Sequence, residues 1–120
     1  MGRLVLSAGI QGSLLQLLIK ELAVQGYLLA SASAGEDISS VIDEVGDKLD
    51  AAIVSLGEPT DADMLSVISA KIPDCPVILI LDRSGEKFIQ PSGMNISAVL
   101  YKPYSLRELL DILETIMKED

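Results

Sequence analysis

The stretch that decides the fold runs from residue 101 to residue 110 and reads YKPYSLRELL. Its first residues fit the end of a strand, and Lys102-Pro103 fits a turn, because proline has no N–H with which to continue a sheet. Leu106, Leu109 and Leu110 then begin an apolar stripe at helical spacing. The stripe continues at three- and four-residue steps through Leu113, Ile116 and Met117. A strand followed directly by an amphipathic helix predicts a protein of the α/β class.

The rest of the chain repeats this alternation of strand and helix. Short apolar runs predict five strands in all: Leu4–Leu6, Tyr27–Ala32, Ala51–Leu56, Pro76–Leu81 and Ser97–Tyr101. Helical spacing predicts five helices: Gln11–Gln25, one that opens at Gly35, one capped by Thr60 or Asp61, a short one over Glu86–Gln90, and the last from Leu106. The short connections favour right-handed crossovers and a parallel sheet. The sequence thus predicts a doubly wound, three-layer α/β/α domain with the flavodoxin-like strand order 2-1-3-4-5.

The composition indicates one domain that spans residues 1–120 and is 49% hydrophobic. Nine basic residues against eighteen acidic ones leave a net charge of −9. This balance argues against a nucleic-acid surface on this domain, because phosphate binding needs a basic face. The acidity is typical of a self-repelling surface, or of an acidic face for a basic partner. No apolar stretch reaches membrane-spanning length and no signal peptide is evident, so we expect a cytoplasmic protein that binds no membrane.

Cys75 is the only cysteine of the chain. An internal disulfide is therefore impossible, which fits a reducing cytoplasm. The neighbouring residues of the segment Pro73–Pro76 include no His or Lys that would activate a thiol. We expect Cys75 to be a residue of a loop or strand edge without a redox role.

The carboxyl ends of the strands are where doubly wound sheets bind their ligands. The segments predicted to lie there are Ser7–Ser13, Ser55–Pro59, Leu81–Ser84 and Lys102-Pro103. The chain has no His, and its first side-chain carboxylate is Glu21, well inside the first predicted helix. Without paired carboxylates at the switch point or an activated Cys, few acid–base groups are left for catalysis. We therefore predict that the chain is not an enzyme and holds no metal ion or cofactor.

Several of these segments carry a resemblance to the receiver domain of two-component signalling, which extends over essentially the whole chain. Lys102-Pro103 is the strongest match, Asp50–Pro59 resembles the third-strand motif of the family, and Pro76–Ile78 resembles the start of its fourth strand. Leu22–Tyr27 and Ala34–Glu36 match weaker landmarks. In the family, the Lys contacts the phosphoryl group and the peptide bond before the Pro is cis.

The departures from the family are concentrated where its phosphorylation chemistry takes place. Ser55 corresponds to the phosphoacceptor Asp, and the paired metal-binding acids fall within Ser7, Ala8, Gly9 and Ile10, none of which is acidic. Phosphorylation of a receiver needs a carboxylate nucleophile and a Mg²⁺ ion held by further carboxylates. The resemblance therefore implies a pseudo-receiver, in which Ser55 is a small residue that fills a vacated pocket.

The remaining positions of this vestigial pocket follow from the same comparison. Leu81 corresponds to the hydroxyl residue that ends the fourth strand of the family. Lys102 needs another partner if it is buried, and Glu58 and Asp82 are the candidates on neighbouring loops. Lys102 would then either hold the turn closed or retain an anion-binding role, and Pro103 could be kept for the turn itself.

A partner surface is the last prediction from the resemblance. In receivers, the fourth helix, fifth strand and fifth helix form a face that mediates dimerisation and output. Here that face would include Phe88, Ile89, Val99, Tyr101 and Tyr104, with Val99 at the position of the family's switch aromatic. Exposed aromatic residues make good interface anchors. The alternative for Phe88 is packing into the core.

The sequence thus predicts a signalling module that acts by protein–protein interaction, with another protein or with a second copy of itself, and that is not switched by aspartyl phosphorylation. The alternative is a flavodoxin-like domain that binds a small ligand or anion with the loop Gly9–Ser13. Glycine-rich turns before a helix can hold an anion with backbone N–H groups. Glycine is equally common in turns that bind no ligand.

Overall fold

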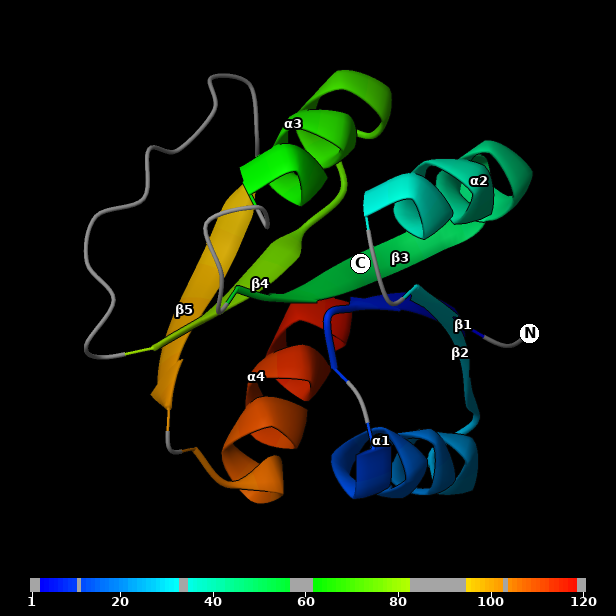
Figure 1. The fold of residues 1–120 in the computed structure, drawn as a ribbon. Helices are drawn as coiled ribbons and strands as arrows, with labels where there is room; N and C mark the ends of the chain where they lie inside the picture. The colour runs from blue at the N-terminus through cyan, green and yellow to red at the C-terminus, as the bar shows by residue number, and fades with distance from the viewer. Residues whose placement is uncertain are drawn as a thin grey trace.

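A five-stranded parallel sheet in the order β2-β1-β3-β4-β5 forms the centre of the molecule (Figure 1). The computed structural model describes residues 3–10, 12–32, 35–56, 62–82, 95–102 and 104–118. The strands are β1 Arg3–Ala8, β2 Tyr27–Ala32, β3 Leu49–Ser55, β4 Val77–Asp82 and β5 Ile96–Lys102. This sheet confirms the predicted doubly wound order.

Helices cover both faces of the sheet, with α1 and α4 on one side and α2 and α3 on the other (Figure 1). Their bounds are α1 Gly12–Val24, α2 Gly35–Val45, α3 Ala62–Lys71 and α4 Leu106–Lys118, and a single 3₁₀ turn, η1, spans Gly46–Lys48. The short helix predicted over Glu86–Gln90 and the predicted caps Thr60 and Asp61 lie outside the described residues. In the part that is described, no helix combines the length and the apolar character needed to cross a membrane.

The first strand is longer than its apolar run. The sequence predicts a strand over Leu4–Leu6 that stops at Ser7, whereas β1 continues through Ser7 and Ala8. The reason is pairing on both sides, since Ser7 lies in register with Ser31 of β2 and with Ile53 of β3. A central strand of a parallel sheet satisfies its backbone hydrogen bonds through its neighbours, so small polar residues can stay extended there.

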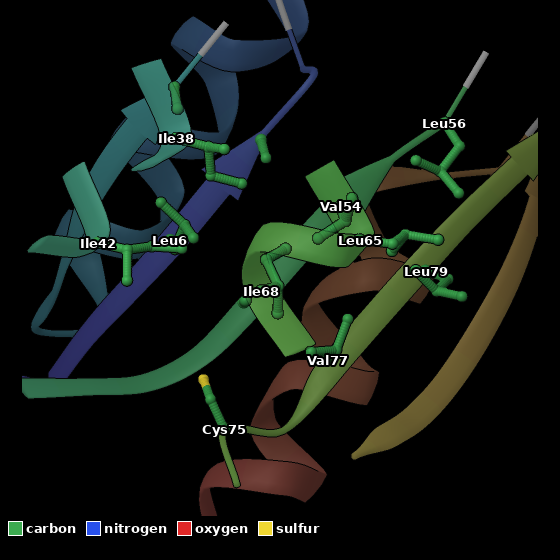
Figure 2. Packing of buried hydrophobic residues seen from close by; sticks show 13 residues of the cluster. Leu6, Ile38, Ile42, Val54, Leu56, Leu65, Ile68, Cys75, Val77 and Leu79 are labelled. Atoms are coloured by element: carbon green, nitrogen blue, oxygen red, sulfur yellow. The ribbon is translucent and has the colours of Figure 1, made fainter. Parts of the chain in front are cut away.

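Two apolar layers hold the helices to the sheet, because successive strand residues point to opposite faces. Along β3, Ala52 and Val54 face α2 and α3, whereas Ala51 and Ile53 face α1 and α4. Figure 2 shows the first layer, in which Ile38 and Ile42 of α2 and Leu65 and Ile68 of α3 pack over Leu6, Val54, Val77 and Leu79. The second layer includes Leu18 and Leu22 of α1 and Leu109, Leu113 and Met117 of α4.

Helix α4 begins with a capping box that follows directly from the sequence pattern Ser-x-x-Glu. The N–H of Glu108 donates to Oγ of Ser105 at 3.1 Å, and the N–H of Ser105 donates to Oε1 of Glu108 at 3.1 Å. At the other end of the helix, Nη1 of Arg3 donates to the carbonyl of Met117 at 2.8 Å. The capping box defines the first turn of α4, and the Arg3 hydrogen bond holds its last turn against the start of β1.

Ser105→Ala is expected to lower the free energy of unfolding by about 1 kcal/mol, because the first turn of α4 loses its side-chain acceptor. Ser105→Asp keeps an acceptor at the same place and should remain close to the wild type. Urea unfolding followed by circular dichroism measures both variants. Equal losses in the two variants would contradict a capping role.

Candidate functional site at the carboxyl ends of the strands

At the carboxyl ends of β1 and β3, the backbone of Gly9 lies very close to the backbone of Ser55. Ala8 lies in register with Val54, and the N–H of Gly9 donates to the carbonyl of Ala32 at 3.1 Å. A Cβ placed on Gly9 would lie 2.4 Å from the carbonyl oxygen of Ser55 and 3.5 Å from its Cβ. The structure therefore brings together two of the segments that the sequence predicts for the site.

Gly9 has a backbone conformation that leaves no room for a side chain. Its φ is +85°, in the region that L-residues other than glycine adopt only with strain. An added Cβ would in addition collide with backbone, which cannot move aside as the end of a flexible side chain could. With this backbone, the position next to Ser55 cannot carry a carboxylate.

Two serine hydroxyls are buried at this end of the sheet. Ser55 is 8% exposed, and Ser7 is fully buried. By the alternation of their strands, with Val5 and Ile53 in the layer under α1 and α4, both side chains point to that face. Oγ of Ser7 has no hydrogen-bond partner within the described part of the chain. A buried hydroxyl that lacks any partner costs about 1–3 kcal/mol.

The ends of β4 and β5 supply the third part of the site. Asp82 is in register with Lys102, so the Lys of the Lys-Pro turn belongs to the strand end. Lys102 is partly buried. Leu81 packs against the α2 and α3 layer, on the opposite face of the sheet from Ser55. Glu58, Pro103 and the side chain of Asp82 lie outside what the structure describes, so the partner of Lys102 stays a prediction.

No group of three or more Cys, Asp or Glu side chains that could hold a metal ion occurs among the residues that the structure describes.

One carboxylate with a structural role, which the sequence reasoning missed, is Asp50. Its Oδ2 accepts a hydrogen bond of 2.8 Å from the N–H of Leu4, where the register of β1 and β3 shifts. A pairing between residues this far apart in the chain has no local sequence signal.

The predicted interaction face is partly visible on β5. Val99 and Tyr101 are both exposed, with Tyr101 at 50%, and they alternate with the buried Leu100. Tyr104 is half-buried against the layer under α1 and α4, and this burial raises the pKa of its hydroxyl. Phe88 and Ile89 fall in the undescribed stretch between β4 and β5.

Cys75 lies in the loop before β4 and packs at the edge of the α2 and α3 layer (Figure 2). Burial, with a contribution from the nearby carboxylate of Asp50, raises the pKa of its thiol to about 11. The thiol is therefore protonated at neutral pH, and a thiol without thiolate character is a poor nucleophile.

The chain resembles known proteins in its structure. No family model matches the chain, and no curated protein matches it. A response regulator receiver domain protein from Clostridium thermocellum has a TM-score of 0.74 and 17% identity, covering 98% of this chain and 95% of that chain. A chain of the CheX-CheY-BeF3-Mg complex from Borrelia burgdorferi has a TM-score of 0.75 and 15% identity, with 96% and 89% covered. A chain of the complex of histidine kinase ThkA with response regulator protein TrrA has a TM-score of 0.68 and 18% identity, with 96% and 98% covered. The chain therefore has the fold of response regulator receiver domains.

Proposed function

We propose that this chain is a receiver-like signalling module that acts through contacts with other proteins and is not switched by phosphorylation of an aspartate. The fold supports a signalling role, and the solved structures of similar fold include chains complexed with a histidine kinase and with CheX. On this proposal the chain is a pseudo-receiver without enzymatic activity, cofactor or metal ion.

The observation that carries this proposal is the contact between Gly9 and Ser55. If Ser55 stands at the phosphoacceptor position, the segment Ser7–Ile10 should supply the acids that hold Mg²⁺. Instead, this segment is uncharged, and its backbone approaches Ser55 too closely for any side chain at Gly9. Phosphoryl transfer depends on positioned carboxylates and a metal ion that neutralises the developing charge, and these residues offer neither.

Output would then depend on a surface and not on a phosphorylated site. Val99 and Tyr101 expose apolar side chains side by side on β5, and Phe88 and Ile89 precede that strand in the sequence. We propose that these residues contact a protein partner of the signalling pathway. Lys102 lies at the end of β5, in register with Asp82 of β4. On this proposal it would hold the turn that follows β5 closed.

An NMR titration of the labelled protein tests the loss of phosphorylation chemistry. Mg²⁺ is added first, and beryllofluoride, a mimic of the phosphoryl group, is added second. We expect no saturable shift in the amide signals of Gly9, Ser55 and Lys102. Stable, Mg²⁺-dependent incorporation of phosphate from a small phosphodonor would overturn the proposal, and so would saturable binding of beryllofluoride at these residues.

The alternative function, anion binding by the loop Gly9–Ser13, has one observation in its favour. The hydroxyl of Ser7, for which no residue of the described ranges serves as a hydrogen-bond partner, lies in the strand that leads into this loop. Against it, the side chain of Ile10 is buried in the apolar layer beneath α1. Titration with inorganic phosphate and with flavin mononucleotide, both without Mg²⁺, separates the two functions, because the alternative requires saturable shifts at Gly9, Gly12 and Ser13.

A further inference from the structure

We infer that the outer edge of β2 is a docking surface for an extended segment of another protein, in which basic residues alternate with apolar ones. The segment would add a strand to the sheet beside β2. This inference goes beyond the proposed function, because it concerns the edge of the sheet opposite to β5 and does not depend on the chemistry around Ser55. It rests on the backbone of β2 and on the different character of the two helices beside it, α1 and α2.

The backbone of β2 offers hydrogen-bonding groups on its outer side. β2 lies at one end of the sheet, next to β1 (Figure 1). The carbonyl of Ala32 accepts from Gly9, so Ala32 directs its peptide groups inward. Because peptide groups alternate in direction along a strand, Leu28 and Ala30 also face β1, whereas Tyr27, Leu29 and Ser31 direct their N–H and C=O groups outward.

The strand lacks the devices by which natural proteins protect an exposed edge. Such edges usually carry a charged residue, a proline or a bulge. β2 reads YLLASA, without charge or proline, and its register with β1 runs without a shift from Tyr27 to Ala32. Among the described residues, no further strand pairs with its outer side. The backbone of this edge therefore fits an added extended strand.

One side of this edge lies under the acidic helix α2. Ala30 packs in the α2 and α3 layer, and Leu28, two residues earlier on the strand, points to the same face and is 65% exposed. Residues 35–50, which include α2, contain six acidic residues and one basic residue. A strand added beside β2 would therefore place every second side chain next to a region of negative charge.

Glu44 is the carboxylate of α2 that the structure places nearest to this edge. Asp43 forms an ion pair with Lys71, which identifies the flank of α2 that faces α3. Glu44 follows about 100° further around the helix, away from α3 and toward the β2 end of the sheet (Figure 1). Because α2 runs back from the end of β2 to the start of β3, its last turn lies at the same end of the sheet as Leu28. Glu44 is exposed, and no cation of the described ranges pairs with it.

The other side of the edge is apolar. Tyr27 and Leu29 pack partly buried against the layer under α1. The charged residues of α1 are one cation and one carboxylate, Lys20 and Glu21, so this helix adds no net charge. Side chains of an added strand that point to this face would therefore be apolar.

The occupant that fits both sides is a basic segment of another protein. A lysine or arginine on the α2 face can cover Leu28 with its aliphatic part while its charge reaches Glu44. A second copy of β2 does not fit in this way, because it brings no cation of its own and would set a second acidic α2 against the first. The alternation of basic and apolar residues follows from the two faces of the edge.

An NMR titration of the isotopically labelled full chain, at about 0.15 M salt, tests the inference. The probe is a peptide with blocked ends in which lysine alternates with valine over six residues, the length of β2. We expect saturable shifts in the amide signals of Tyr27, Leu29 and Ser31. A peptide that alternates glutamate with valine has the same length and strand preference, and it should cause no shift at these residues.

Two pairs of variants separate the backbone from the charge. Ser31→Pro removes one outward N–H at an exposed edge position and should weaken binding of the lysine peptide by about tenfold, whereas Ser31→Ala keeps that N–H and should bind like the wild type. Glu44→Gln should weaken binding by about threefold. Asp43→Asn makes the same change in charge on the flank that faces α3 and should leave the affinity unchanged.

Circular dichroism melting confirms that each variant is folded, and Glu44→Gln decides the matter should Ser31→Pro not fold. No binding of the lysine peptide up to millimolar concentration would overturn the inference. Equal weakening by Asp43→Asn and Glu44→Gln would do the same, because it would indicate attraction to the overall charge of the chain. Shifts at Tyr27, Leu29 and Ser31 when the protein is concentrated without peptide would assign the edge to a second copy instead.

Discussion

Gly9→Ala is expected to destabilise the protein by about 3 kcal/mol, because two unfavourable effects add. The first is backbone strain, since φ at Gly9 is +85°. The second is a collision, since the new methyl carbon would lie 2.4 Å from the carbonyl oxygen of Ser55. Relief of this collision requires β1 and β3 to separate at the centre of the sheet, where both strands are fully paired.

Gly26→Ala provides the matched control for this prediction. Gly26 follows α1 with a φ of +88°, but a Cβ there would meet no atom within 4 Å. Its cost is therefore the backbone strain by itself, about 1 kcal/mol. Urea unfolding midpoints of the two variants separate strain from collision. A loss in Gly9→Ala no greater than that in Gly26→Ala would show that the end of β1 can move away from Ser55 at little cost.

Ser55→Asp is expected to lower the free energy of unfolding at pH 7 by about 2–3 kcal/mol, as the burial of an unpaired carboxylate does. Ser55 is 8% exposed, and the neighbouring Ala8 and Gly9 bring neither a cation nor a side-chain hydrogen-bond donor. A chain that already carries a net charge of −9 makes one more negative charge less favourable.

The loss should depend on pH in a way that identifies its cause. Burial raises the pKa of a carboxyl group above its usual value of about 4, so the unfolded state loses the proton first as pH rises. The destabilisation is therefore greatest at pH 7 and smallest below about pH 4. Ser55→Asn has nearly the same shape and no charge, so its difference from the wild type should not change with pH.

Mg²⁺ should not restore the stability of Ser55→Asp, because no second carboxylate has room at Gly9. The measurement is urea unfolding of both variants at pH 4 and pH 7, with and without Mg²⁺. An aspartate variant as stable as the wild type at pH 7 would mean that a cation, most directly Lys102, reaches the site.

The architecture was predictable from local patterns. Unbroken apolar runs such as Val77–Leu81 indicate strands buried on both faces, and the stripe that includes Leu109 and Leu113 indicates a helix packed on one side. The alternation of these elements with short connections leaves few topologies, and the observed strand order is the expected one. The capping box of Ser105 and Glu108 also has a local signature, which the reasoning from sequence overlooked.

The candidate site was predictable as a set of segments but not as an arrangement. The topology places Ser55, Gly9 and Lys102 at the same edge of the sheet, at the carboxyl ends of β3, β1 and β5, and the absence of acids from Ser7–Ile10 is visible in the sequence itself. The sequence did not predict which strand residues point to the same face of the sheet. This depends on how far each strand extends, and β1 extends through Ser7 and Ala8 because it pairs with β2 and β3. The position of Leu81 also depends on strand pairing. Ser55 is in register with Ile80 of β4, so the next residue, Leu81, points to the opposite face of the sheet.

By itself, the sequence determined the class of fold, the strand order and the lack of acidic residues in the segment Ser7–Ile10, because these properties follow from local periodicity, chain connection and residue identity. Only the tertiary structure decided that the backbone at Gly9 excludes a side chain, that the hydroxyl of Ser7 is buried without a partner in the described part of the chain, and that the uncharged edge of β2 faces outward. Each of these depends on distances between strands that are remote in the chain, and no local pattern encodes such distances.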